Sequence, residues 1–349
     1  MDSPLRLLVA LPRFVPQGDS TSLFFERLLG GIESVERVKV GILYGRPPMW
    51  AEAETPKRWD SFSFHAPRRK DYPLPLRPLI RLISFLTPWG GGWPHRHHAH
   101  SGIQEAVSRF KPDVVLCHDF PVLIEGVQKI CPEKTVLWMM EPNPLVPGGR
   151  GVRRLRDLLH RPSWIRWARE VAMVCTTWSD KKETLALGKE IGKEIRLLFP
   201  GVPPAVSPKK IEPKVGYFGS LRKTHRDWLQ PRIASLEEAL RERGLHLFFR
   251  GLGKDASEWV LEHTSGAVVL DDWISPEQAR EEMSSCRFLL SLGGSAIQVL
   301  GKTFDYLSSG RPTLHLTSWK RRWSITSEGR CGEGVALGYI ATADEEGGE

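Results

Sequence analysis

The chain has 349 residues, of which 41% are hydrophobic and 26% charged, and its formal net charge is +8. This balance argues against a disordered chain, and at ~100–200 residues per domain the length predicts two domains. No apolar run reaches the ~18 residues of a membrane-spanning helix. The five cysteines lack CxxC spacing, which argues against a disulfide framework or structural zinc site and favours a reducing cytoplasm.

Apolar runs alternate with segments of helical periodicity in the first half of the chain, a pattern typical of α/β units around a parallel sheet. Strands are expected at residues 5–11, 38–43, 113–117, 135–140 and 171–176. Helices are expected at residues 23–32, 101–110, 122–130 and 153–169, the last interrupted at Pro162, and after the N-cap Ser179. The histidine-rich segment 95–100 is interpreted as a flexible loop, because its Gly- and Pro-rich approach gives no fixed geometry for a metal.

A proline- and lysine-rich stretch, residues 199–214, has no helical period and predicts an interdomain linker. A second α/β series follows it, with strands expected at residues 215–218, 245–250, 267–270, 288–292 and 312–316. Its helices are expected at residues 227–243, 257–262, 276–285 and, as the end of a helix, 304–309. We therefore predict two α/β domains, residues 1–206 and 207–349, with a ligand cleft between the carboxyl ends of their sheets.

The excess of positive charge lies entirely in the first of these domains. Residues 1–206 have a net charge of +9 and the remainder a net charge of −1. Basic residues are concentrated in residues 57–81 and 150–169. This asymmetry favours an anionic partner for the first domain, such as a membrane surface, a phosphorylated acceptor or nucleic acid. A solvated surface with no partner is the alternative interpretation.

The most specific stretch is GKTFDYLSSGRPTL, residues 301–314. Lys302 and Asp305 are three residues apart and share one face of a helix near its N-terminal end. Helix amides and an ammonium group together favour a phosphate, and a carboxylate one turn further can accept hydrogen bonds from ribose hydroxyls. The alternative interpretation is a surface Lys–Asp pair.

This stretch resembles the nucleotide-sugar segment of GT-B glycosyltransferases, particularly those of glycosyltransferase family 4, where a Lys precedes Glu-Tyr-Leu and a Gly-Arg/Lys-Pro. Other stretches are similar to that family in the same order: PDVVLCHDF, FPGVPPAVSP, VGYFGSL, LFFRGLG and DDWISPEQAREEMSSCRFLLSL. The resemblance implies an α/β fold of two Rossmann-like domains facing across a cleft. Residues 1–206 would bind an acceptor, and residues 207–349 a nucleotide-diphosphate sugar.

The resemblance also implies roles for individual residues. Asp305 stands where the family has its ribose-binding Glu, and Lys302, with Arg222 or Lys223 after the Gly219 loop, would face the donor diphosphate. The glycines Gly251 and Gly253 would let the backbone approach the nucleobase, and Gly18 would lie under the donor phosphates. The candidate catalytic residues are His118 near the sugar, Asp19 for orienting an acceptor hydroxyl, and Glu141 as a further acid.

These features predict a glycosyltransferase that is metal-independent and retaining and uses a UDP- or GDP-linked sugar without a further cofactor. The basic domain favours an anionic or membrane-linked acceptor, as in cell-surface glycan or glycolipid assembly, and a cytoplasmic protein at the inner face of the membrane. Ile297 stands where the family has the first of two glutamates. A catalytically silent relative acting as a binding or scaffold subunit is therefore one alternative, and a nucleic-acid-modifying glycosyltransferase is another.

Residues 79–86, LIRLISFL, lie near tryptophans that have two open interpretations. The four tryptophans within or beside the basic stretches are Trp89, Trp93, Trp164 and Trp167. Together with residues 79–86 they either seat the first domain on a membrane interface or belong to amphipathic core helices.

Overall fold

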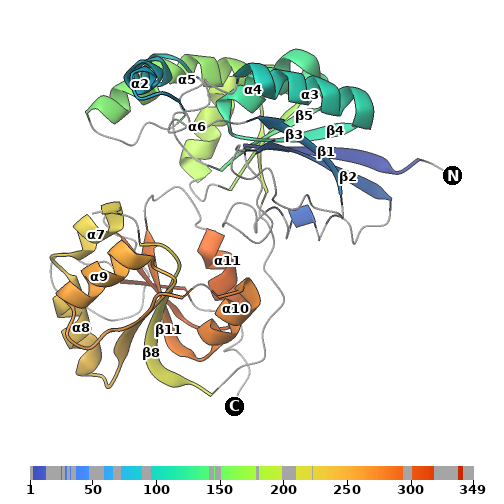
Figure 1. Cartoon of the computed structure of the whole chain (residues 1–349). Coiled ribbons are helices and arrows are strands. Elements are labelled where there is room, and N and C mark those ends of the chain that lie inside the picture. The colour runs from blue at the N-terminus through green and yellow to red at the C-terminus, as the bar shows by residue number, and fades with distance from the viewer. Residues whose placement is uncertain are drawn as a thin grey trace. The chain divides into compact units, whose positions relative to one another are not determined.

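The structure, a computed structural model, divides into two compact units (Figure 1). Unit 1 comprises Met1–Gly201 with Ile297–Val299, and unit 2 comprises Val202–Ala296 and Leu300–Glu349. The described residues are 3–12, 25, 28–29, 32, 37–46, 59–65, 72–88, 96–140, 145, 151–177, 181–198, 210–221, 223–272, 274–293, 301–317 and 337–340.

Unit 1 contains a seven-stranded sheet in the order β3-β2-β1-β4-β5-β6-β7, with parallel pairing throughout. Its strands are β1 (Leu5–Leu11), β2 (Val38–Arg46), β3 (Asp60–His65), β4 (Val114–His118), β5 (Thr135–Met139), β6 (Met173–Thr176) and β7 (Ile195–Leu197). From β1 the chain passes outward to β2 and β3, then returns to place β4 on the other side of β1. Ligands of open α/β sheets bind at the carboxyl ends of the strands beside such a reversal.

Two apolar layers cover the faces of this sheet, because alternate residues of each strand point to opposite sides. Leu8 and Ala10 pack in one core, and Leu7 and Val9 pack in the other with Phe25. The first core is closed by α3 (Arg96–Phe110), α4 (Pro121–Ile130), α5 (Val152–Glu170) and α6 (Lys181–Ile191). A short 3₁₀ helix, η4 (Pro132–Lys134), precedes β5. Figure 1 shows α3, α4 and α5 on one side of the sheet, with α2 (Leu76–Leu86) beside α5.

Unit 2 contains a six-stranded sheet in the order β10-β9-β8-β11-β12-β13. Its strands are β8 (Glu212–Phe218), β9 (His246–Arg250), β10 (Val268–Leu270), β11 (Cys286–Gly293), β12 (Thr313–Thr317) and β13 (Leu337–Ile340). All pairs are parallel except β12 with β13. The strand order reverses between β8 and β11, which makes this position the topological switch point of unit 2.

The helices of unit 2 lie on both faces of its sheet. One face is covered by α7 (Lys223–Leu229), α8 (Ile233–Arg241) and α9 (Lys254–His263). The other packs against α10 (Pro276–Ser284) and α11 (Gly301–Ser308) through Met283 and Tyr306. A capping box begins α10, because the Ser275 hydroxyl accepts from the Gln278 amide while the Gln278 side chain accepts from the Ser275 amide. Unit 2 is thus a Rossmann-like three-layer arrangement, and unit 1 has a parallel sheet of the same kind with an apolar layer on each face.

Three predictions of local structure are wrong. The helix expected over residues 227–243 is two helices, α7 and α8, with Pro231 between them, where a missing N–H and a fixed φ interrupt the backbone ladder. Pro162, in contrast, lies inside the continuous α5. Pro162 and Leu158 are both exposed. Because proline has no N–H, the Leu158 carbonyl has no helical donor, and water can take the place of that donor on the exposed side of the helix. The histidine-rich segment expected to be a loop is helical from Arg96, in the first turns of α3.

Glu125 of α4 explains why these histidine-rich turns are ordered. Its carboxylate accepts hydrogen bonds from Arg96 Nε and Nη2 at 2.9 and 2.8 Å, and from Lys129 Nζ at 2.7 Å. Nε2 of His100 lies 3.7 Å from the same carboxylate. The segment is therefore held by an ion-pair cluster that joins α3 to α4.

The tryptophans of α5 belong to the core. Trp164 and Trp167 are almost fully buried, and their rings lie 6.1 Å apart, so the core interpretation holds for them. Trp89 and Trp93 lie outside the described residues. Among the helices that the structure describes, none has the length and apolar character needed to cross a membrane.

Candidate functional site

The carboxyl ends of β8 and β9 carry glycines whose φ angles are positive. Gly219 follows β8 with φ 90°, and Gly251 follows β9 with φ 67°, a conformation that side-chain-bearing residues rarely adopt. The Gly219 amide donates to the Arg250 carbonyl at 2.8 Å, and the Gly251 amide donates to the Leu270 carbonyl at 3.0 Å. The turns after β8 and β9 therefore lie side by side, with bare backbone that a ligand can approach closely.

The N-terminus of α9 begins directly after these turns. Gly253 is its N-cap, with no side-chain cap, and its carbonyl accepts from the amides of Ala256 and Ser257, both at 3.0 Å. The Ser257 hydroxyl donates to Asp271 Oδ1 at 3.0 Å, which ties the helix to the segment after β10. The amide end of a helix attracts negative charge. This sheet edge therefore combines exposed backbone with a positive helix end.

Tyr306 fixes α11 to the switch point. Its side chain is buried, and its hydroxyl donates to the Leu290 carbonyl at 3.2 Å and accepts from the Phe218 amide at 3.3 Å. The tyrosine thereby joins β8 to β11, and its burial raises the pKa of the phenol. Arg311 Nε donates to the Ser284 carbonyl at 2.8 Å, so the segment after α11 is also tied to α10. The helix that contains Lys302 and Asp305 is thus anchored through Tyr306 to β8 and β11, and through Arg311 to α10.

The sequence-predicted residues of unit 2 occupy this edge to different extents. Asp305 directly precedes Tyr306 in α11 and is half-buried, and Lys302 lies in the first turn of the same helix. The exposed Lys223 begins α7, four residues after Gly219. The described structure places no side chain of Lys302, and Arg222 lies outside the described residues.

In unit 1 the candidate site is the end of β4, beside the reversal between β1 and β4. His118 is the last residue of β4, and its Nδ1 lies 2.8 Å from Oδ1 of Asp119. Asp119 is buried, and its Oδ2 accepts a hydrogen bond of 2.8 Å from the amide of Met140, the residue directly after β5. The His118 ring lies 5.9 Å from that of Phe25, which itself packs edge-on against Trp138. The imidazole is therefore held between a carboxylate and an aromatic ring.

The sequence singled out His118 but gave no role to Asp119. The available signal was the His-Asp pair at the end of a buried strand, since polar residues at that position lie at the ligand-binding edge. The remaining predicted residues of the first domain, Gly18, Asp19 and Glu141, lie outside the described residues. Among all residues that the structure describes, no three His, Cys, Asp or Glu side chains form a group able to hold a metal ion.

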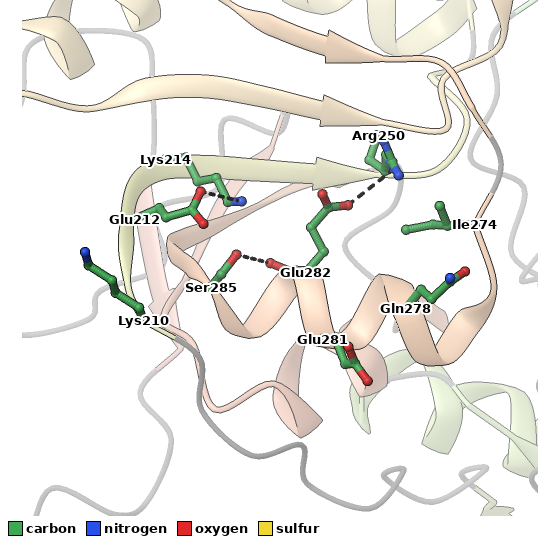
Figure 2. A pocket seen from close by; sticks show the side chains of 9 residues that line it. All are labelled: Lys210, Glu212, Lys214, Arg250, Ile274, Gln278, Glu281, Glu282 and Ser285. Atoms are coloured by element: carbon green, nitrogen blue, oxygen red, sulfur yellow. Dashed lines mark hydrogen bonds and ion pairs between the residues drawn. The ribbon is translucent and has the colours of Figure 1, made fainter.

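A pocket of about 570 Å³ lies between β8 and α10 in unit 2, as Figure 2 shows. None of the sequence-predicted site residues is among those that line it, although Arg250 directly precedes the Gly251 turn. Its lining is mostly charged: Lys210, Glu212, Lys214, Arg250, Ile274, Gln278, Glu281, Glu282 and Ser285. None of these residues had a predicted role.

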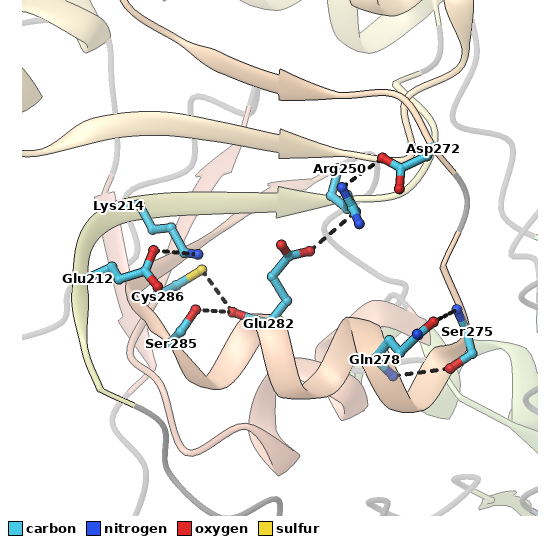
Figure 3. Close-up of polar contacts among 9 residues, drawn as sticks. All are labelled: Glu212, Lys214, Arg250, Asp272, Ser275, Gln278, Glu282, Ser285 and Cys286. Atoms are coloured by element: carbon cyan, nitrogen blue, oxygen red, sulfur yellow. Dashed lines mark hydrogen bonds and ion pairs between the residues drawn. The ribbon is translucent and has the colours of Figure 1, made fainter.

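Lys214 and Arg250, two of the cations that line this pocket, form ion pairs with carboxylates (Figure 3). Lys214 Nζ lies 2.9 Å from Glu212 and 4.6 Å from the ring centre of Phe248. Arg250 contacts Asp272 at 2.7 Å and Glu282 at 3.3 Å. Because three basic and three acidic side chains line the pocket, it has no excess positive charge for a diphosphate. The glycine turns and α11 fit such a ligand better.

The comparisons with known proteins show likeness in fold only. No family model and no curated protein matches the sequence. A trehalose-6-phosphate synthase, studied with bisubstrate glycomimetics of transfer with retention, is 10% identical, with a TM-score of 0.55 over 89% of this chain and 83% of its own. An alpha-glucosyltransferase in complex with UDP and a 13-mer DNA containing an HMU base is 12% identical, with a TM-score of 0.51 over 90% and 80%. A putative UDP-N-acetylglucosamine 2-epimerase from Listeria monocytogenes is 11% identical, with a TM-score of 0.52 over 89% and 79%.

These likenesses define the class of fold. The chain is an α/β protein with the GT-B fold, and the expectation of that fold is confirmed. The finer resemblance to glycosyltransferase family 4 stays a prediction. A transferase and an epimerase share this architecture, so function has to be argued from the site itself.

Proposed function

We propose that the protein is a glycosyltransferase that takes its sugar from a nucleotide diphosphate and uses the carboxyl edge of unit 2 as the donor site. The observation that carries this proposal is the Tyr306 bridge between β8 and β11. It holds the segment with Lys302 and Asp305 at the switch point, where α/β sheets bind nucleotides.

Each group at this edge has a role in the proposed site. Asp305 accepts hydrogen bonds from the ribose hydroxyls, while Gly219, Gly251 and Gly253 let the backbone meet the nucleotide. The diphosphate gains charge as the sugar departs, and cationic groups stabilise that charge. Lys302, Lys223 and Arg222 supply these cations, together with the amide ends of α9 and α11. The proposed transfer therefore proceeds without a metal ion.

Unit 1 is the proposed acceptor unit. Asp119 and Phe25 orient the His118 imidazole at the end of β4. His118 is the proposed catalytic residue for the reacting sugar, Asp19 the proposed residue that orients the acceptor hydroxyl, and Glu141 a further candidate acid. The net charge of +9 over residues 1–206 favours an anionic or membrane-linked acceptor, as in glycan or glycolipid assembly at the cytoplasmic face of a membrane. We propose retention of configuration, in line with the retaining mechanism studied for the synthase of similar fold.

Thermal unfolding with a panel of UDP-, GDP- and dTDP-sugars tests the donor site. A nucleotide sugar that binds should raise the Tm. Asp305→Ala and Lys302→Ala should each lower the affinity for that nucleotide sugar about tenfold. Glu238→Ala and Arg241→Ala on the exposed face of α8 are matched controls and should leave it unchanged. Absence of stabilisation by every nucleotide sugar would refute the donor site.

The same variants address the scaffold alternative, which Ile297 in place of an acid keeps open. A catalytically silent binding subunit should keep its biological function when Asp305 and Lys302 are replaced. A transferase should lose its function. The measurement is complementation of a strain that lacks the gene, with protein levels matched.

Transfer to nucleic acid is a second candidate function. One protein of similar fold is bound to UDP and to DNA, and unit 1 is strongly basic. A nucleic-acid acceptor requires duplex or tRNA binding that falls steeply with salt, because phosphate contacts release counterions. The experiment is titration of a labelled 13-mer duplex at salt concentrations between 50 and 200 mM. For about six phosphate contacts, the affinity should be ~10³-fold weaker at 200 mM than at 50 mM.

A further inference from the structure

The two adjacent helices α2 and α5 present leucines to solvent. Large apolar side chains are exposed at closely spaced positions on these helices and just before α2. Folded domains rarely expose so many apolar side chains together. They are Leu74, Leu76, Leu79, Leu82, Leu86, Val152, Leu155, Leu158 and Leu159, with exposed fractions from 45% to 72%. They make up more than half of the exposed large apolar side chains among the described residues. We call this set the leucine face.

The helices forming this face are packed against each other by their other sides. Ile80 is the buried residue of α2, and the buried His160 of α5 bonds the Phe85 carbonyl through Nε2 at 2.8 Å. Trp164 and Trp167 of α5 point into the core of unit 1. At 100° per residue, Leu82 lies about 160° from Ile80, and Leu158 lies about 120° or more from His160, Trp164 and Trp167. Leu159, beside Leu158, is 52% exposed. The leucine face is therefore an outer surface of a well-fixed helix pair.

The charge around this face is positive. Arg81 of α2 and Arg154 and Arg166 of α5 are exposed. The sequence of α2 contains no acidic residue, and Asp157 of α5 is buried beside Arg156, 3.0 Å from its Nη2. The exposed Glu170 is the last residue of α5, eleven residues beyond Leu159. Leucines interleaved with arginines, on helices that lie along a surface, are the pattern of a helix pair that inserts shallowly at an anionic lipid interface.

We propose that the leucine face docks unit 1 onto an anionic lipid surface, with its leucines in the headgroup region and its arginines at the lipid phosphates. Charge complementarity selects this occupant over a second copy of the chain. In a two-fold dimer the same arginines would face one another, and like charges across an interface cost binding energy. This inference rests on the proposed function, in which the acceptor is membrane-linked. Docking of unit 1 on the lipid surface would bring it to an acceptor in the bilayer.

Vesicle flotation of the full chain tests the docking. The chain should float with vesicles of phosphatidylcholine and phosphatidylglycerol at 3:1, and stay in solution with phosphatidylcholine alone. Leu82→Glu with Leu159→Glu should weaken partitioning at least tenfold, since each leucine loses its apolar burial. Arg81→Gln and Arg154→Gln should each weaken it about fivefold.

Matched controls separate docking from misfolding and from a general loss of apolar surface. Leu185→Glu in α6 and Leu261→Glu in α9 change leucines of similar exposure outside the face and should float like the parent. Circular dichroism and Tm establish that each variant folds. Equal flotation of the parent and the Leu82→Glu/Leu159→Glu variant, or no flotation with anionic vesicles, would overturn the proposal. So would a dimer in sedimentation velocity that this double variant dissociates.

Donor binding distinguishes failure of the docking from failure of the proposed function. Nucleotide-sugar stabilisation should be unchanged in the Leu82→Glu/Leu159→Glu variant, because unit 2 holds the donor site. Flotation without any donor binding would support the lipid docking and refute the proposed transferase function. Donor binding without flotation would retain the transferase and remove the docking.

Discussion

The hydroxyl of Tyr306 in α11 accepts a hydrogen bond of 3.3 Å from the backbone amide of Phe218, the last residue of β8. The same hydroxyl donates to Leu290 of β11 at 3.2 Å. Direct pairing of β8 and β11 is described as far as Leu289 opposite Gly216, so the tyrosine extends the connection between the two strands by one more step. One side chain thus sets the position of α11 relative to both strands at the switch point.

Replacing Tyr306 with Phe should destabilise unit 2 by about 1–3 kcal/mol, because the buried Phe218 amide and Leu290 carbonyl both lose a partner. It should also weaken nucleotide-sugar binding, since α11 is no longer fixed. Urea unfolding and donor-induced Tm shifts measure the two effects. Tyr217→Phe is the control, because its hydroxyl donates at 3.0 Å to the carbonyl of the exposed Ser220, which water can satisfy. An equal loss in the two variants would show that the bridge has no special role.

Asp119 is predicted to act as a positioning residue for His118. Asp119→Asn keeps an acceptor for the Met140 amide but removes the negative charge 2.8 Å from His118 Nδ1. We expect kcat for sugar transfer to fall about tenfold or more, with the KM for the donor unchanged, because the donor binds unit 2. Glu133→Gln, on the exposed η4, is the control. A purely structural role would instead lower the Tm and leave kcat of the folded enzyme unchanged.

The four described cysteines should be unreactive in the folded protein. Burial raises the pKa of the Cys286 thiol to about 12, and it also raises the pKa values of Cys117, Cys131 and Cys175. Only the thiolate is nucleophilic, so none should react at pH 8. In a Cys331→Ser variant, a chromogenic disulfide reagent should detect no thiol before unfolding and four after it. Rapid labelling of the native variant would contradict this.

The central strands could be predicted because parallel strands covered on both faces are continuous apolar runs. β3 could not, because it is the edge strand of its sheet and its residues, DSFSFH, alternate between polar and apolar. The helical histidine segment was missed for a related reason. Its order depends on Glu125, which is distant in sequence, and no local pattern reports that contact.

The candidate site divides in the same way. The Gly219 and Gly251 turns and the segment of α11 have local signatures, because a positive φ requires glycine and a helix start has typical residues. The Arg250 ion pairs had no such signature. Their partners Asp272 and Glu282 come from the segment after β10 and from α10, and only the folded sheet brings them together.

Stability should fall in acid through Glu125. Burial alone would raise the pKa of this carboxyl, but hydrogen bonds from Arg96 and Lys129 outweigh burial and lower it from 4.5 to about 2. The carboxylate therefore stabilises the fold fully above about pH 4.5, and this contribution is lost as the pH falls toward 2. Glu125→Gln should cost roughly 2–3 kcal/mol at pH 7, and the difference from the parent should shrink progressively below pH 4.5 in urea unfolding. The exposed Glu133→Gln should show no such pH dependence. A cost for Glu125→Gln that stays constant down to pH 2.5 would mean that the α3–α4 junction does not depend on this charge.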